Sequence, residues 1–212
     1  MINAPLDIGL QTTLFTAILL LAGTIFTSTV FANLGDKKKA LAWLTLPASQ
    51  FEKYLVAWLY SYLILIIVYT SCFYVVLLFL TSIKHFPGQH TEIFDLFNNN
   101  FGYKVFLLYA FLHAIAFFGA IFFEKLHFIK TAFVFFIGIA VLIVINNLIQ
   151  PAMLGAIVTI NVPFGGLSFM DHNHIKEINL VNADERYILS IASTLTIILW
   201  TAAYYRLKEK QV

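Results

Sequence analysis

The stretch Gly35–Lys53, GDKKKALAWLTLPASQFEK, joins the first two long apolar runs and holds the densest positive charge in the chain. Glycine suits the end of one helix, and Asp36 suits the N-cap of the next. Three lysines follow the cap: Lys37, Lys38 and Lys39. Cations in a first turn oppose the helix dipole, so we assign the lysines to membrane topology or to anionic lipid headgroups. Apolar residues with Trp43 at their centre then predict a short helix lying in the membrane interface.

A second helix is predicted to begin directly after this interfacial segment. Pro47 ends the first helix, because the residue before a proline avoids helical geometry. Ser49 and Glu52 have the spacing of a capping box, in which each side chain bonds the other residue's backbone N–H. No strong breaker follows until Pro87. A helix over 50–82 would be about 50 Å long, against a hydrocarbon core of about 30 Å, so we expect its first turns to project from the membrane.

The composition explains why membrane insertion is expected at all. Apolar residues make up 60% of the 212 residues, and charged residues only 11%, whereas soluble proteins carry about 25% charged residues. We therefore predict an all-α integral membrane protein. The net charge of +2 gives no indication of nucleic-acid binding. The one cysteine, Cys72, lies in an apolar run, where we expect a small buried hydrophobe.

The apolar runs predict about five transmembrane helices in a single domain covering 1–212. Their expected ranges are 8–34, 50–82, 103–123, 129–147 and 187–205. The first contains several hydroxyl side chains, which can bond their own backbone and which we assign to helix packing. Gln150–Pro151 is expected to close the fourth. The segment 151–186 is interrupted by Pro163 and Gly165–Gly166, which favours a re-entrant or surface-lying piece followed by an external loop.

Lysine and arginine positions predict the orientation. Nine of them fall in the 35–53 loop, the 124–130 turn and the C-terminal tail, and four fall in the opposite loops. Of the acidic residues, four fall in the first set of loops and seven in the opposite set. Because cytoplasmic loops carry the excess of Lys and Arg, we expect the N-terminus outside and the C-terminus in the cytoplasm.

Few residues indicate catalytic chemistry. His113 lies in the middle of the third span, where a hydrogen bond to a neighbouring helix is a more common role than a functional one. The loop Asp171–His174 holds two histidines, but a zinc site needs three or four ligands, so a solvated loop is favoured. The chain has no zinc-protease motif, no nucleophile elbow and no phosphate-binding loop. An enzyme and a bound cofactor are therefore not expected, although a membrane enzyme using the external histidines remains a third hypothesis.

At 46–53, Leu-Pro-Ala-Ser-Gln-Phe-Glu-Lys, the chain resembles permease subunits of type 2 ATP-binding-cassette exporters. The Ser-x-x-Phe segment at 28–31 and the ending at 204–212 are similar to the short bacterial members, which are frequent in Bacteroidetes. These motifs cover only 28–60 and 200–212, while the layout matches over most of the chain. The resemblance implies a multi-pass protein of the bacterial inner membrane.

The family implies a six-helix permease that pairs with a second permease, as a homodimer or heterodimer, and is driven by a separate ATPase subunit. A cytoplasmic coupling helix lies between its second and third spans, and a segment re-entering from outside lies between its fifth and sixth. Both positions match 35–53 and 151–186 if the first family helix is missing. The residues expected to contact the ATPase are then Leu46, Pro47, Ser49, Glu52 and Lys53. The alternative is a non-transporting membrane scaffold or assembly factor.

Overall fold

The computed structural model describes residues 7–31, 47–83, 93–96, 101–123, 125–154, 157–158, 167–171, 174–178 and 185–210. The helices in chain order are α1 (Ile8–Val30), α3 (Gln50–Trp58), the π-helical segment η2 (Leu59–Ile64), α4 (Leu65–Ile83), α5 (Phe101–Phe122), α6 (His127–Leu154) and α7 (Glu185–Glu209). The strands are β1 (Ile157–Val158), β2 (Leu167–Asp171) and β3 (His174–Ile178).

The prediction of a helical multi-pass membrane protein is confirmed. Five helices are long and apolar enough to cross a membrane, and α3, η2 and α4 together form the longest of them, with 33 residues from Gln50 to Ser82. The start at Gln50 is the predicted one. The predicted interfacial helix, with its three lysines, falls outside the described residues.

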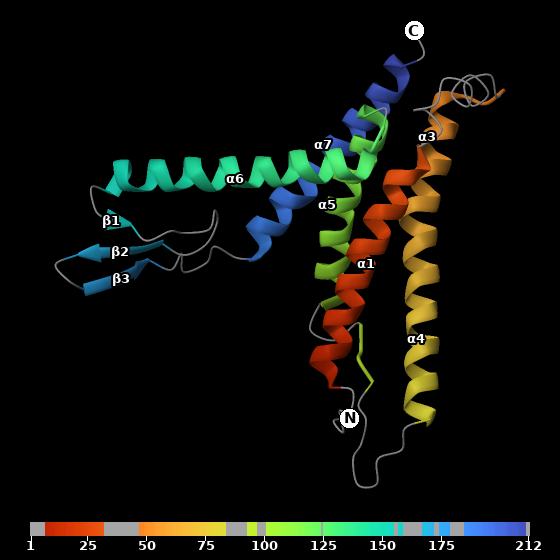
Figure 1. Ribbon diagram of the computed structural model, residues 1–212, viewed down its shortest axis with the longest axis horizontal. Helices are drawn as coiled ribbons and strands as arrows, with labels where there is room; N and C mark the ends of the chain where they lie inside the picture. The colour runs from red at the N-terminus through yellow and green to blue at the C-terminus, as the bar shows by residue number, and fades with distance from the viewer. Residues whose placement is uncertain are drawn as a thin grey trace.

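Helix α5 is the centre of the bundle and contacts α1, α6 and α7 (Figure 1). Its buried face alternates bulky rings with small residues, among them Ala110, Ala114 and Ala120, and small residues let membrane helices approach closely. The closest approaches are made at glycines. A Cβ added to Gly23 of α1 would overlap the ring of Tyr109 on α5.

The hydroxyl side chains of α1 bond their own backbone, as predicted. Thr27 Oγ1 donates to the Gly23 carbonyl at 2.7 Å, and Ser28 Oγ donates to the Thr24 carbonyl at 2.9 Å. Gln11 reaches further, because its Oε1 accepts from the backbone N–H of Phe94 at 3.0 Å. The short segment 93–96 is thereby fastened to α1.

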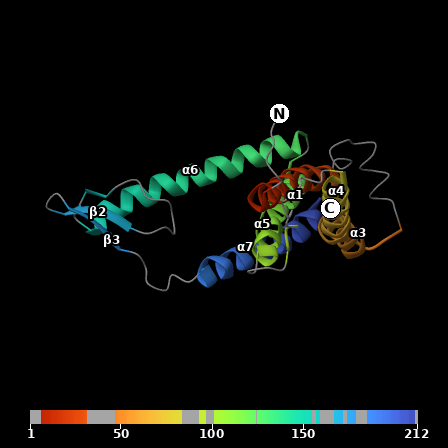
Figure 2. The same ribbon diagram turned by 90° about the horizontal axis from the view of Figure 1, so that it is seen from below.

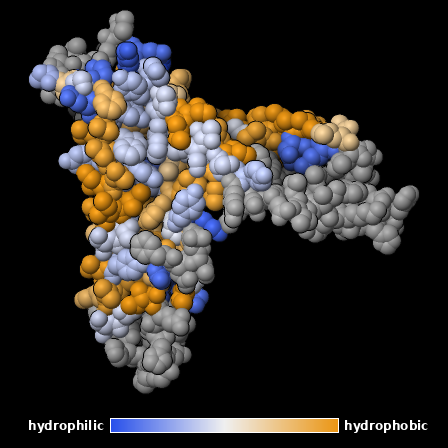
Figure 3. Space-filling model, turned by 180° about the vertical axis from the view of Figure 1, so that it is seen from behind, coloured by the Kyte–Doolittle hydropathy of each residue, from blue (hydrophilic) through white to orange (hydrophobic). Residues whose placement is uncertain are grey.

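Helix α6 leaves the bundle at a steep angle and extends away from it in both ribbon views (Figures 1 and 2). Only 6% of its most apolar window is buried inside the protein, and the arm is orange along this helix in the hydropathy view (Figure 3). The predicted end near Asn147 is wrong, since the helix passes Pro151 and ends at Leu154. Pro151 lies in the last turn, where the missing N–H costs a single backbone bond.

A small antiparallel sheet of order β1–β2–β3 follows α6. Strands β2 and β3 form a hairpin in which Leu167 pairs with Ile178 and Asp171 pairs with His174. The sequence analysis anticipated no strands in 151–186. Two short runs joined by the two residues 172 and 173 are a hairpin pattern that it passed over. His172 itself lies outside the described residues, as do 155–156, 159–166, 173 and 179–184.

The end of α1, the start of α3, the α5–α6 turn and the end of α7 lie together, while the start of α1 and the end of α4 lie at the opposite end (Figure 1). Cys72 corrects one expectation, because it is exposed on α4 rather than buried. An apolar span with lipid around it need not turn its cysteine inward.

Candidate functional site

The start of α3 carries the predicted capping box. Ser49 Oγ accepts from the backbone N–H of Glu52 at 3.2 Å, and the backbone N–H of Ser49 donates to Glu52 Oε2 at 2.7 Å. The carboxylate also lies in the first turn, where it favours the positive end of the helix dipole. The two reciprocal bonds fix where the helix begins, and therefore how far it extends beyond the apolar core.

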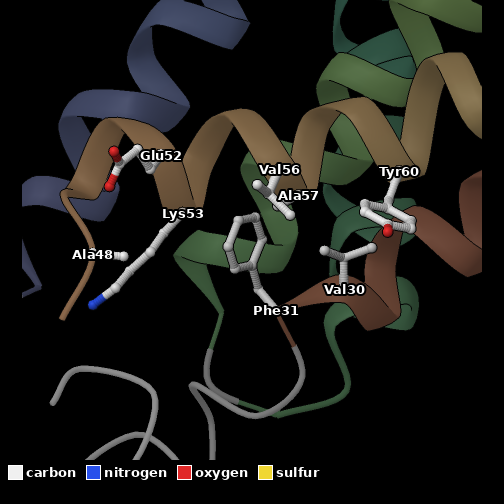
Figure 4. A pocket seen from close by; sticks show the side chains of 8 residues that line it. All are labelled: Val30, Phe31, Ala48, Glu52, Lys53, Val56, Ala57 and Tyr60. Carbon is white, nitrogen blue, oxygen red and sulfur yellow. The ribbon is translucent and has the colours of Figure 1, made fainter. Parts of the chain in front are cut away.

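A pocket of about 350 Å³ lies between this helix start and the end of α1 (Figure 4). Its walls are mainly apolar and include Phe31 of α1 and Tyr60 of η2. Glu52 and Lys53 form its polar rim, and Figure 4 shows the Lys53 ammonium pointing past Ala48 toward the loop side. The pocket combines an apolar floor with two opposite charges at its edge.

The structure brings most of the predicted partner-contact residues together. Ser49 is the N-cap of α3, Glu52 and Lys53 lie in its first turn, and Pro47 is just before it. Lys53 is only 8% exposed, so its aliphatic stem is part of the packing beside the pocket. Leu46 lies outside the described residues.

A second polar site lies inside the bundle and is centred on His113, which is fully buried. Ser61 of η2 lies 2.8 Å from His113 Nε2, and Trp200 Nε1 of α7 donates to His113 Nδ1 at 3.1 Å. Tyr109, one turn earlier on α5, donates its hydroxyl to the Ser61 carbonyl at 2.8 Å. One histidine thus joins three helical elements, as predicted for a polar group that ties membrane helices together.

The direction of these bonds fixes the tautomer of His113. An indole nitrogen can only donate, so Nδ1 must be the acceptor and the neutral ring carries its proton on Nε2. Nε2 then donates to Ser61 Oγ, and the hydroxyl donates onward to the Ala57 carbonyl at 2.7 Å. Every donor in the chain of bonds has an acceptor, which is the condition under which a buried network stabilises a fold.

This tautomer also decides what the network can do chemically. A serine next to a histidine is the arrangement of an activated nucleophile, in which the histidine nitrogen accepts the hydroxyl proton. Here Nε2 already carries a proton, and Ser61 is 0% exposed. The pair is therefore arranged for structure rather than for attack on a substrate. Among the described residues, no three His, Cys, Asp or Glu side chains are grouped as metal ligands.

The sequence analysis missed the aromatic partners of His113. Tyr62 stacks on Tyr109 with ring centroids 5.7 Å apart, and Trp200 meets Trp58 edge to face at 5.3 Å. Tyr54, Trp58 and Tyr62 recur every fourth residue, as do Tyr109, His113 and Phe117 in the third span. That spacing places each set on one helix face and could have indicated the contact between them.

Comparisons of the chain with protein-family models, with curated proteins and with solved structures found no match.

Proposed function

We propose that the chain is a permease-like membrane subunit of an ATP-binding-cassette exporter, driven by a separate ATPase subunit. The observation that carries the proposal is the capped start of α3. The helix from Gln50 to Ser82 has 33 residues, about 50 Å at 1.5 Å per residue, against a core of about 30 Å. Its first turns therefore extend toward the aqueous phase at the end where the loops expected in the cytoplasm are grouped.

The pocket beside α3 suits a protein partner. Its apolar walls offer a seat for one hydrophobic side chain, and its rim offers the opposite charges of Glu52 and Lys53 (Figure 4). Interfaces of this kind take most of their binding energy from a buried apolar anchor, while the charges at the rim set the orientation. An ATPase subunit with such an anchor would attach at the one point where the long helix leaves the membrane.

Movement at this point would be passed into the bundle. Tyr54 OH donates to the Trp200 carbonyl at 2.9 Å, and the Phe51 ring lies against Tyr204 with centroids 6.1 Å apart. Helices α3 and α7 are in this way fastened to each other near the partner end. A push on α3 therefore acts on α7, which is what a coupling element has to do.

The remaining partners follow from the same hypothesis. A second permease, identical or related, would complete the exporter in the bacterial inner membrane, and Lys37, Lys38 and Lys39 would contact anionic lipid headgroups. A non-transporting scaffold is the second candidate, favoured by the His113 network, in which both ring nitrogens and the Ser61 hydroxyl are hydrogen-bonded within the bundle.

The test is copurification of the chain with the ATPase subunit encoded beside it. The double variant Glu52→Lys with Lys53→Glu is expected to recover at least about tenfold less ATPase, because inverting two rim charges juxtaposes like charges. Glu52→Gln removes the charge but keeps the start of α3, because glutamine also completes a capping box. This variant therefore distinguishes an effect of the charge from an effect of misfolding. Asp95→Lys with Lys104→Glu inverts two exposed charges at the opposite end of the bundle and serves as the matched control.

Equal recovery with all variants would contradict coupling through α3. Failure to recover any ATPase with the unmodified chain, while the purified chain remains folded, would favour the scaffold instead. Loss of ATPase with Glu52→Gln as well as with the double variant would assign the contact to the Glu52 charge.

A further inference from the structure

The long second span is not one regular helix. Six residues, Leu59–Ile64, form the π-helical segment η2 between α3 and α4. The stretch LYSYLI contains neither proline nor glycine, so no breaker in the sequence causes the change of geometry. In a π turn the backbone bonds reach one residue further than in an α turn, and such turns occur mostly as single inserts inside α-helices.

Side chains stabilise η2 where its backbone bonds are rearranged. Ser61 Oγ donates to the Ala57 carbonyl at 2.7 Å, and Tyr109 OH donates to the Ser61 carbonyl at 2.8 Å. His113 Nε2 lies 2.8 Å from the same hydroxyl. Tyr109 and His113 are four residues apart on α5, so one face of this helix holds Ser61 within the π segment, and α1 also packs against η2.

The two halves of the span donate tyrosine hydroxyls to different helices. Helix α3 packs on α7, and Tyr54 donates to the Trp200 carbonyl of that helix at 2.9 Å. Helix α4 packs on α1, and Tyr69 donates to the Phe15 carbonyl there at 2.8 Å. Each half is thus fastened by a tyrosine to a separate helix. The span is fully described from Tyr54 to Tyr69, and between these two attachments only η2 departs from α geometry.

We propose that η2 is a hinge about which α3 and α7 move together relative to α4 and α1, with Tyr109 and His113 of α5 as the clamp that sets the resting state. The hinge deepens the proposed function, because it says how a partner bound at the start of α3 would change the bundle. The hinge motion does not require the partner, because the two positions of the hinge would differ only in contacts within this chain.

The first experiment deletes one residue. A π turn holds one residue more than an α turn, so deletion of Leu63 should convert η2 to α geometry while both flanking helices keep their positions. Deletion of Leu21, in the regular helix α1, should instead rotate every following side chain by about 100°. Both leucines are exposed, at 40% and 62%. We expect the Tm in detergent to fall by less than about 4 °C for the first deletion and by at least about 10 °C for the second.

The second experiment measures the movement. In a Cys72→Ser background, spin labels at Val56→Cys on α3 and Leu10→Cys on α1 report the distance between the two units in nanodiscs without any ATPase. Both positions are about half exposed, at 52% and 51%. We expect two distance populations in the parent chain and one after deletion of Leu63. Tyr109→Phe should raise the ratio of the minor to the major population about threefold, the factor for a membrane hydrogen bond of average strength.

Tyr103→Phe, an exposed tyrosine on the same helix, is the matched control and should leave the ratio unchanged. If deletion of Leu63 lowers the Tm as much as deletion of Leu21, η2 does not contain a single inserted residue that can be removed. One identical distance population in the parent and deletion chains would overturn the hinge. Because neither measurement contains an ATPase, both outcomes are separate from failure of the copurification.

Discussion

Helices α5 and α6 are neighbours in the chain and similarly apolar, but the protein packs around one and leaves the other exposed. Of the most apolar window of each helix, 56% is buried in α5 and 6% in α6. The buried helix carries Tyr109 and His113, which bond to η2 and α7, and alanines that admit close neighbours. Inside a bilayer lipid tails are as apolar as leucine, so hydrogen bonds and close packing decide which helices associate.

The glycines of the two regions make the same contrast. A Cβ at Gly23 would overlap the Tyr109 ring, and one at Gly119 would overlap the Thr131 side chain, whereas a Cβ at Gly138 of α6 would meet nothing within 4 Å. Glycine is needed where helices touch and is incidental where lipid takes the place of a neighbour.

The largest effect is expected from His113→Ala. The change leaves a cavity and removes the acceptor of Trp200 Nε1, and the two losses together should lower the free energy of unfolding by about 3 kcal/mol. Unfolding by SDS titration in mixed micelles measures it. The control is Phe136→Ala on α6, where the ring is 66% exposed and a change below about 0.5 kcal/mol is expected. Equal losses at both positions would remove the distinction between the two helices.

A smaller loss is expected when a side chain is inserted between α1 and α5. Gly23→Val should lower the free energy of unfolding by about 2 kcal/mol, because the Tyr109 ring is bonded to Ser61 and cannot move aside without breaking that bond. Gly138→Val is the matched substitution on α6 and should be neutral in the same SDS titration. A destabilised Gly138→Val variant would indicate that the part of α6 around Gly138 also has a packing partner in the folded protein.

Much of the fold could be predicted from the sequence, but not the contrast between α5 and α6. The five spans, the start at Gln50 and the Ser49–Glu52 box follow from local rules, because apolar length and capping depend on residues close together in the chain. The η2 segment does not, since it depends on Tyr109 and His113, which lie about 50 residues away. The sheet in 151–186 was missed because short strands give weaker signals than helices of membrane length.

The next prediction concerns a polar side chain that ties α1 to the segment 93–96. Gln11 is 1% exposed, and its Oε1 accepts from the Phe94 N–H. Gln11→Leu leaves that donor buried without its acceptor and should lower the free energy of unfolding by about 1.5 kcal/mol. Ser71→Ala, which removes an exposed hydroxyl bonded only to its own helix, should change it by less than about 0.5 kcal/mol. Similar values for the two variants would contradict a fastening role for Gln11.

The smallest effect is expected from removing a tyrosine hydroxyl, a group that α6 lacks. No tyrosine occurs in 127–154, whereas Tyr54, Tyr69 and Tyr109 each donate a hydroxyl to another helix. Tyr54→Phe keeps the ring contacts with Phe117 and removes one bond to the Trp200 carbonyl, so a loss of about 0.6 kcal/mol is expected. Tyr205→Phe, at an exposed ring, should show none in the same titration. If the two variants agree, ring packing rather than the hydroxyl fastens α3 to α7; if they differ, the Tyr54 hydroxyl contributes to holding α3 against α7.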